Sequence, residues 1–252
     1  MGDVRSSCKQ CSPESARIRL VRLLPDLGEY ETRVYDWDSG NVDRSRRAFG
    51  ALCERKPRAI CRDAGAAMTF LLPNGFDPTL HFPRDKDRSR SLLGLPICRH
   101  ILCYAGNLLP RSGVLELVQA VGRLKERGVS TLFIVLGQGP WGERVLRLAS
   151  QLGLVDSVLL KQVHYNDVLL FLGAADVLLA PYLRDRRTDF LMVPQKLAEY
   201  MACGRPIVVS DVGEIRRVMI DSETGLLSKP GNPEDIADKI QSVLNNPQLA
   251  NR

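Results

Sequence analysis

No long hydrophobic run is present in this sequence. The best candidate for a membrane span, residues 168–183, is interrupted by Asp176 and is shorter than the roughly 20 residues that a spanning helix needs. No apolar signal region follows Met1. We therefore expect a cytoplasmic protein. The start, MGDVRS, fits the loose pattern for N-myristoylation and leaves open a peripheral association with the inner face of the membrane.

Closely spaced metal ligands are also scarce. Cys8 and Cys11 form a CxxC pair, but the next two cysteines are eight residues apart, which is too loose for a zinc site. We expect free thiols, a reducing compartment and no bound metal. Three further cysteines lie in or beside apolar stretches and are predicted to be small buried hydrophobes: Cys98, Cys103 and Cys203.

Neither sign of charge dominates the chain. Its 252 residues carry 35 Lys and Arg against 29 Asp and Glu, and +5 of the net +6 falls within residues 1–100. A basic patch can bind nucleic acid, but here acidic residues are interleaved with the basic ones, so we expect no nucleic-acid partner. The hydrophobic share of 44% is enough for one large domain or two small ones.

The first part of the chain has little apolar periodicity. Residues 1–66 are interpreted as an atypical lead-in or the remnant of a first domain, partly ordered, with one strand within residues 31–38. Residues 83–96 are rich in charge and are predicted to be a surface loop.

From residue 99 onward, short apolar runs alternate with helical patterns. Six strands are predicted within residues 100–106, 131–137, 157–160, 176–182, 206–210 and 224–230. Six helices are predicted within residues 112–128, 140–153, 165–175, 194–204, 214–221 and 232–246. Pro140 suits a first helical turn, Gly204 a helix end and Asn232 an N-cap. This alternation predicts an α/β fold for residues 67–252, with a doubly wound parallel sheet and helices on both faces.

Ligands of such sheets bind at the carboxyl ends of the strands, so the loops after the strands are the places to search. Gly137 and Gly139 follow a buried strand and would let backbone approach a phosphate, although such turns are also common for structural reasons alone. Arg111 follows the first strand of this series and could neutralise a leaving diphosphate, or it could be an ordinary surface arginine.

The helix at 194–204 contains one acid, Glu199, among apolar neighbours. The backbone N–H groups at residues 191–194 would point at an anion, and the helix dipole would add to their effect. Glu199 is then placed to accept hydrogen bonds from two vicinal ribose hydroxyls. The alternative is a solvated glutamate, but a carboxylate among apolar residues needs partners.

Taken together, the motifs YAGNLLPRSG, VLGQGP, DVLLAPY and KLAEYMACGRPIVVSD resemble the C-terminal, donor-binding domain of GT-B glycosyltransferases of family 4, or group 1, from about residue 68 to the end. The resemblance implies a Rossmann-like domain that binds a UDP- or GDP-linked sugar, with transfer that retains the anomeric configuration and needs no metal or cofactor. It implies a catalytic role for Arg111. The substrate-binding positions it implies are Asn107, Gly137, Gly139, His164, Leu191, Met192, Val193, Pro194, Lys196 and Glu199.

The sequence departs from the family pattern in three places. The first glutamate of the paired motif falls on Leu191, and the two phosphate-binding cations fall on Asn107 and Ser112, with Arg111 next to the latter. Pro194, Lys196, Glu199 and Tyr200 instead fit a P-x-K-x-x-E-Y-x-A subgroup.

Residues 1–66 are too short for the acceptor domain of a GT-B enzyme. Three hypotheses follow: a transferase completed by a separate acceptor-domain subunit, an inactive or binding-only fragment, and a UDP-sugar epimerase-like protein. The acceptor, whether lipid-linked glycan, protein or small molecule, is not identified.

Overall fold

The computed structural model of the chain describes residues 75–185 and 193–246, together with the backbone of four short strands nearer the start. The chain divides into two compact units, Met1–Pro73 and Asn74–Arg252. The boundary expected after residue 66 stays a prediction. The CxxC pair, the myristoylation pattern and most of the interpreted lead-in lie outside the described residues.

The first unit contains two short strand pairs. The members of the antiparallel pair are β1 (Val21–Arg22) and β2 (Arg33–Val34), and those of the parallel pair are β3 (Gly50–Leu52) and β4 (Thr69–Leu71). The strand expected within residues 31–38 is confirmed by β2, whose two residues pair with β1.

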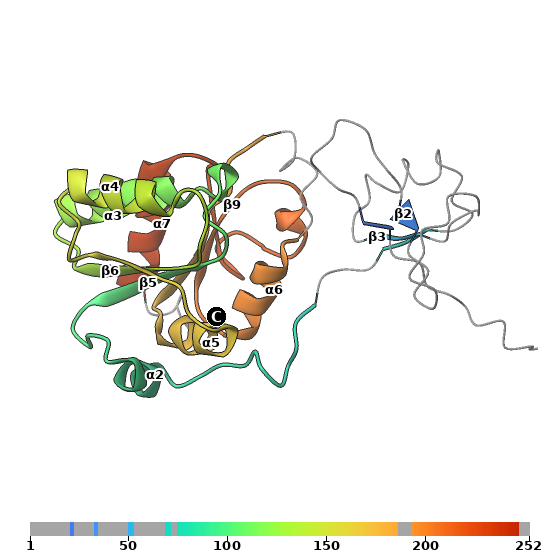
Figure 1. Cartoon of the computed structure of the whole chain (residues 1–252), viewed down its shortest axis with the longest axis horizontal. Helices are drawn as coiled ribbons and strands as arrows, with labels where there is room; N and C mark the ends of the chain where they lie inside the picture. The colour runs from blue at the N-terminus through green and yellow to red at the C-terminus, as the bar shows by residue number, and fades with distance from the viewer. Residues whose placement is uncertain are drawn as a thin grey trace, which may run out of the picture. The chain divides into compact units, whose positions relative to one another are not determined.

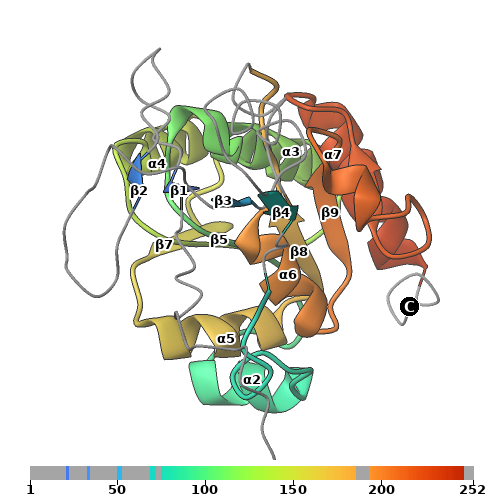
Figure 2. The same cartoon turned by 90° about the vertical axis from the view of Figure 1, so that its right-hand side faces the viewer.

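Six strands form one entirely parallel sheet in the second unit (Figures 1 and 2). They are β5 (His100–Ala105), β6 (Thr131–Leu136), β7 (Val158–Lys161), β8 (Val177–Ala180), β9 (Ile207–Ser210) and β10 (Leu226–Ser228). Their order across the sheet is β10-β9-β8-β5-β6-β7. The predicted doubly wound parallel sheet is confirmed, strand by strand.

Helices cover both faces of this sheet (Figure 1). On one face lie α3 (Val114–Glu126), α4 (Gly142–Gln151) and α7 (Pro233–Asn245). On the other lie α2 (Lys86–Leu93), α5 (Tyr165–Ala174) and α6 (Gln195–Ala202). Two single 3-10 turns are η1 (Pro110–Ser112) and η3 (Ile215–Arg217). None of the helices built from the described residues combines the length and the apolar character that a bilayer crossing requires.

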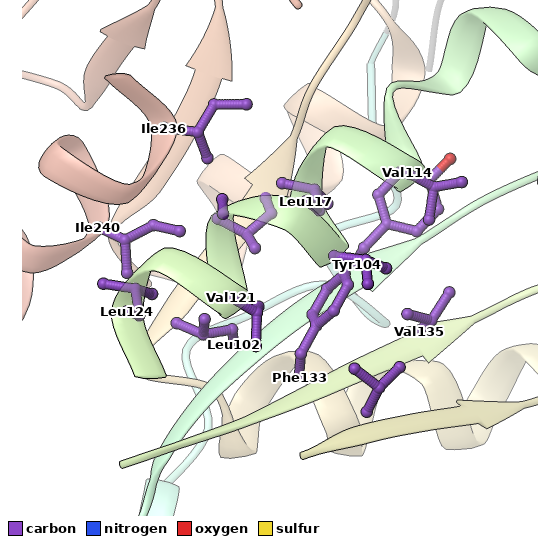
Figure 3. Packing of buried hydrophobic residues seen from close by; sticks show 14 of the residues in the cluster. Leu102, Tyr104, Val114, Leu117, Val121, Leu124, Phe133, Val135, Ile236 and Ile240 are labelled. Carbon is purple, nitrogen blue, oxygen red and sulfur yellow. The ribbon is translucent and has the colours of Figure 1, made fainter. Parts of the chain in front are cut away.

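Alternation along the strands divides the core into two layers. In β5, Leu102 and Tyr104 belong to the layer under α3 and α7, whereas Ile101 and Cys103 belong to the opposite layer. Figure 3 shows the first layer, in which strand residues of β5 and β6 meet the apolar faces of the two helices. Continuous apolar strands are therefore explained by burial on both faces.

The prediction of a surface loop at residues 83–96 is wrong, because these residues contain α2. The side chain of Asp85 caps the helix by accepting from the N–H of Arg88 at 2.7 Å, and Gly94 ends it with a φ of 64°. The helix has no broad apolar stripe, and its most buried long side chain is Arg90. Tertiary ion pairing therefore replaces the apolar periodicity on which the sequence prediction relied.

Two smaller predictions also need correction. Pro140 lies before α4, which begins at Gly142, so it is not in the first helical turn. Cys98 is exposed in the connection between α2 and β5, beside the exposed Ile97, whereas Cys103 and Cys203 are buried as expected. The N-cap role of Asn232 is confirmed by a hydrogen bond from the N–H of Asp235.

The single charge in the apolar stretch 168–183, Asp176, is explained by its hydrogen-bond partners. Its Oδ2 accepts from Arg90 Nη2 at 2.6 Å and from the N–H of Ile101 at 2.7 Å, and its Oδ1 accepts from Lys86 Nζ at 3.0 Å. Burial raises the pKa of Asp176, but the hydrogen bonds from Ile101 and Lys86 and the charge of Arg90 outweigh it, so the pKa lies below its ordinary value. One carboxylate thus attaches α2 to the start of β5.

Asp176→Asn should destabilise the protein by about 3–5 kcal/mol, because it leaves the buried Arg90 guanidinium without its counter-charge. Urea unfolding of the full chain at pH 7 measures this loss. The control, Asp238→Asn, removes an exposed ion pair with Arg127 and should cost less than about 1 kcal/mol. Because the pKa of Asp176 is lowered, its contribution should fade as the pH falls below about 4. Equal losses for both variants would contradict this assignment.

Candidate functional site

The strand order places a reversal between β5 and β8. From β5 the chain proceeds to β6 and β7 on one side, and then returns to β8, β9 and β10 on the other. The loops that leave β5 and β8 therefore diverge above their carboxyl ends, which is where doubly wound sheets bind ligands. Gly106 follows β5 there, and Pro181 follows β8.

The glycines of the loop after β6 are required by close packing against the backbone of the loop after β5. A Cβ on Gly137, whose φ is 150°, would lie 2.0 Å from the carbonyl oxygen of Gly106, and one on Gly139 would lie 2.5 Å from that of Leu108. The loops are joined by a hydrogen bond from the N–H of Leu108 to the carbonyl of Gln138 at 2.9 Å. The structural explanation for the GQGP turn thus accounts for its glycines, while contact with a ligand stays a prediction.

Lys196 carries the cation of this site. Its Nζ lies 4.2 Å from the ring centroid of Tyr104 and 5.6 Å from that of Tyr182, so it faces one aromatic ring from β5 and one from the loop after β8. A Cβ on Gly106 would lie only 2.4 Å from it. Burial lowers the pKa of Lys196 to about 8, and the charge of Glu199 opposes that shift. The amine is therefore a desolvated cation at the switch point of the sheet.

Tyr200 attaches α6 to the end of β5. Its ring is fully buried, and its hydroxyl accepts a hydrogen bond from the N–H of Ala105 at 2.7 Å. Because Lys196 lies one helical turn before Tyr200, this anchor brings the lysine side chain to Gly106.

Glu199 is partly buried and has partners, so the alternative of a fully solvated glutamate does not hold. Its Oε1 accepts from Tyr165 Oη and from Gln195 Nε2, each at 3.2 Å. His81 Nε2 lies 4.0 Å from the same oxygen. The carboxylate therefore faces the start of α5 and the segment before α2.

Arg111 and the remaining predicted residues lie around this centre. Arg111 and Asn107 are exposed, and His164 is exposed at the N-cap position of α5. Val193 and Pro194 precede α6 and are partly buried. Since proline has no N–H, the expected amide donors at 191–194 can include only 191–193. Leu191 and Met192 lie outside the described residues.

Four residues of this neighbourhood were missed at the level of sequence: Tyr104, Tyr182, Tyr165 and His81. Tyr104 stands directly before the Ala105-Gly106 pair, which was a usable signal. His81 is more than 110 positions from Glu199, and no spacing rule connects them.

Taken together, the fold and the site define a doubly wound α/β protein with a lysine and a glutamate on one helix at the carboxyl edge of its sheet. Residues 85–252 match the family described as glycosyl transferases group 1. The chain belongs to this family, and it matches the C-terminal type of domain in it.

Curated relatives include the D-inositol 3-phosphate glycosyltransferase of Acidothermus cellulolyticus, which is 32% identical over 69% of this chain and 40% of its own length. The 2-deoxystreptamine glucosyltransferase of Streptomyces kanamyceticus is 27% identical over 80% of this chain and 53% of its own length. The chain thus spans about half or less of these relatives.

Solved structures share the fold. Sucrose-phosphate synthase from Thermosynechococcus elongatus has a TM-score of 0.64 at 25% identity, and covers 80% of this chain and 50% of its own. The Anabaena protein HepE, solved in complex with UDP and glucose, has a TM-score of 0.65 at 20% identity, with 80% and 55% covered.

Lys196→Met should stabilise the unliganded protein by roughly 2–4 kcal/mol at pH 7, because it removes a desolvated charge. The pKa of this lysine is about 8 in the folded protein and about 10.4 when unfolded, so the cost is complete below pH 8 and should disappear as the pH rises toward 10.4. Urea unfolding of wild type and variant at pH 7, 8.5 and 10 measures the difference. A difference that does not change with pH would contradict the proposed desolvation.

Proposed function

We propose that this chain binds a nucleotide-diphosphate sugar, UDP- or GDP-linked, at the carboxyl ends of β5 and β8, and supplies the donor half of a retaining, metal-independent glycosyltransferase. The observation that carries the proposal is the Lys196 ammonium beside Gly106 at the switch point. Membership of the glycosyl transferases group 1 family supports it, as do the glycosyltransferase relatives.

The diphosphate would lie against Lys196. Within residues 75–185 and 193–246 no ion pair of Lys196 is found. A compact ammonium of this kind favours an anionic ligand, and its desolvation strengthens the interaction. Glu199 lies next along α6 and would accept hydrogen bonds from the ribose hydroxyls. Gly137 and Gly139, Asn107 and residues 191–194 would border the nucleotide, with His164 near its base.

Transfer would then proceed on one face of the sugar. The bond between the anomeric carbon and the diphosphate breaks, and the electron pair leaves with the diphosphate. An acceptor hydroxyl forms the new bond from the same side, and its proton passes to the departing diphosphate oxygen. Lys196 would stabilise the negative charge of the departing diphosphate. The exposed Arg111, on η1, would be a second cation for the same charge. Because side-chain cations supply this neutralisation, a metal is not needed in the proposal.

Acceptor binding is assigned to another domain or a separate subunit. A cytoplasmic location, with peripheral membrane association through the MGDVRS start, remains part of the proposal. Measuring transfer from UDP- and GDP-sugars beside binding separates a working transferase from a binding-only chain.

Glu199→Ala should weaken UDP or GDP binding about 10- to 100-fold, because the ribose hydroxyls lose a charged acceptor. Isothermal titration of the full chain measures both nucleotides. The exposed Glu223 offers a matched control, and Glu223→Ala should bind as wild type does. Undiminished affinity of Glu199→Ala for every uridine and guanosine diphosphate conjugate would refute the proposed ribose contact.

The affinity for UDP should fall by about fivefold between pH 8 and pH 9, because the protonated fraction of the Lys196 amine falls from about one half to about one tenth above its pKa of about 8. Lys196→Arg should remove this pH dependence, since a guanidinium stays charged, and Lys196→Met should bind weakly at both pH values. A flat wild-type profile, combined with a large loss in Arg111→Ala, would assign the principal cation to Arg111 instead.

A further inference from the structure

Tyr165 connects Glu199 to a residue of a distant segment. Its hydroxyl lies 3.2 Å from Glu199 Oε1 and 3.0 Å from His81 Nε2. The His81 ring is buried, and its Nδ1 lies 3.2 Å from the carbonyl oxygen of Asp77. A continuous path therefore runs from the backbone before α2, through α5, to the carboxylate on α6.

The proton positions along this path follow from the chemistry of its groups. The carbonyl of Asp77 can only accept, so His81 Nδ1 donates to it. Tyr165 has one hydroxyl proton, and it can donate to Glu199 while accepting from His81 Nε2 when both ring nitrogens carry protons. Burial and the charge of Glu199 raise the pKa of Tyr165 to about 12, so its phenol keeps the proton that it donates.

The contacts are confined to one of the two carboxylate oxygens. Among the described residues, the hydrogen bonds of Glu199 come from Tyr165 and Gln195, and both end on Oε1. Two donors on one oxygen hold the carboxylate plane and leave Oε2 to accept from a ligand.

We propose that Tyr165, held by His81, is a positioning residue that orients Glu199 so that Oε2 faces the ribose hydroxyls of the bound nucleotide. The proposal rests on the function proposed above. Tyr165 touches Glu199 and not the reacting atoms, so it acts through the carboxylate. The effect is expected only for ligands that carry the ribose hydroxyls, since these are what the oriented oxygen would bind.

The test compares UDP with 2′,3′-dideoxy-UDP, or the guanosine pair if GDP is the nucleotide that binds, by isothermal titration of the full chain. Wild type should prefer UDP by at least tenfold. Tyr165→Phe should reduce that preference three- to tenfold and leave the dideoxy nucleotide within twofold of wild type. The control, Asn166→Ala, alters an exposed neighbour in the same helical turn and should keep the full preference.

A Tyr165→Phe variant that loses affinity for both nucleotides by the same factor, or for neither, overturns the inference. His81→Gln, which keeps a donor for the phenol oxygen, should retain more of the preference than His81→Leu. Failure of the proposed function gives a different result: wild type would then bind no nucleotide, or would not distinguish UDP from its dideoxy analogue.

Discussion

The candidate site depends on how α6 is attached to the end of β5. Tyr200 makes this attachment with a fully buried ring and a hydroxyl that accepts from the N–H of Ala105. On the same helix, Lys196 lies one turn before Tyr200, and Glu199 lies directly before it. Their positions relative to Gly106 therefore follow from a single anchored side chain, because a helix transmits the orientation of one residue to its neighbours.

Placing the charge of Lys196 at this site costs free energy, because the amine loses hydration. The Lys196 amine is shielded from water and faces two tyrosine rings, which compensate only in part for its lost hydration. A strongly shifted pKa in a loop-lined position is characteristic of functional sites. Arg111, the cation that the sequence favoured, is exposed on a single 3-10 turn.

Prediction from sequence succeeded where burial produces a repeated local pattern. All six strands of the sheet are runs of apolar residues, and both N-cap and helix-end signals at Asn232 and Gly204 were readable within a few positions. It failed at α2, whose charged sequence is helical because Arg90 and Lys86 pair with Asp176 about 90 positions later. Cys98 was misjudged for a related reason, since an apolar neighbour such as Ile97 can itself be exposed.

The sequence by itself determined the order of strands and helices and the parallel doubly wound class. It also made Glu199 a candidate through its apolar neighbours and Lys196 a candidate through the family resemblance. Those properties are local, or depend on motifs within a dozen residues. Only the tertiary structure decided that β8 lies beside β5, that Tyr104 and Tyr182 flank the Lys196 amine, and that His81 and Tyr165 meet Glu199. The physical reason is that such contacts join residues far apart in the chain, and their distances are set by strand order and side-chain packing, which periodicity does not encode.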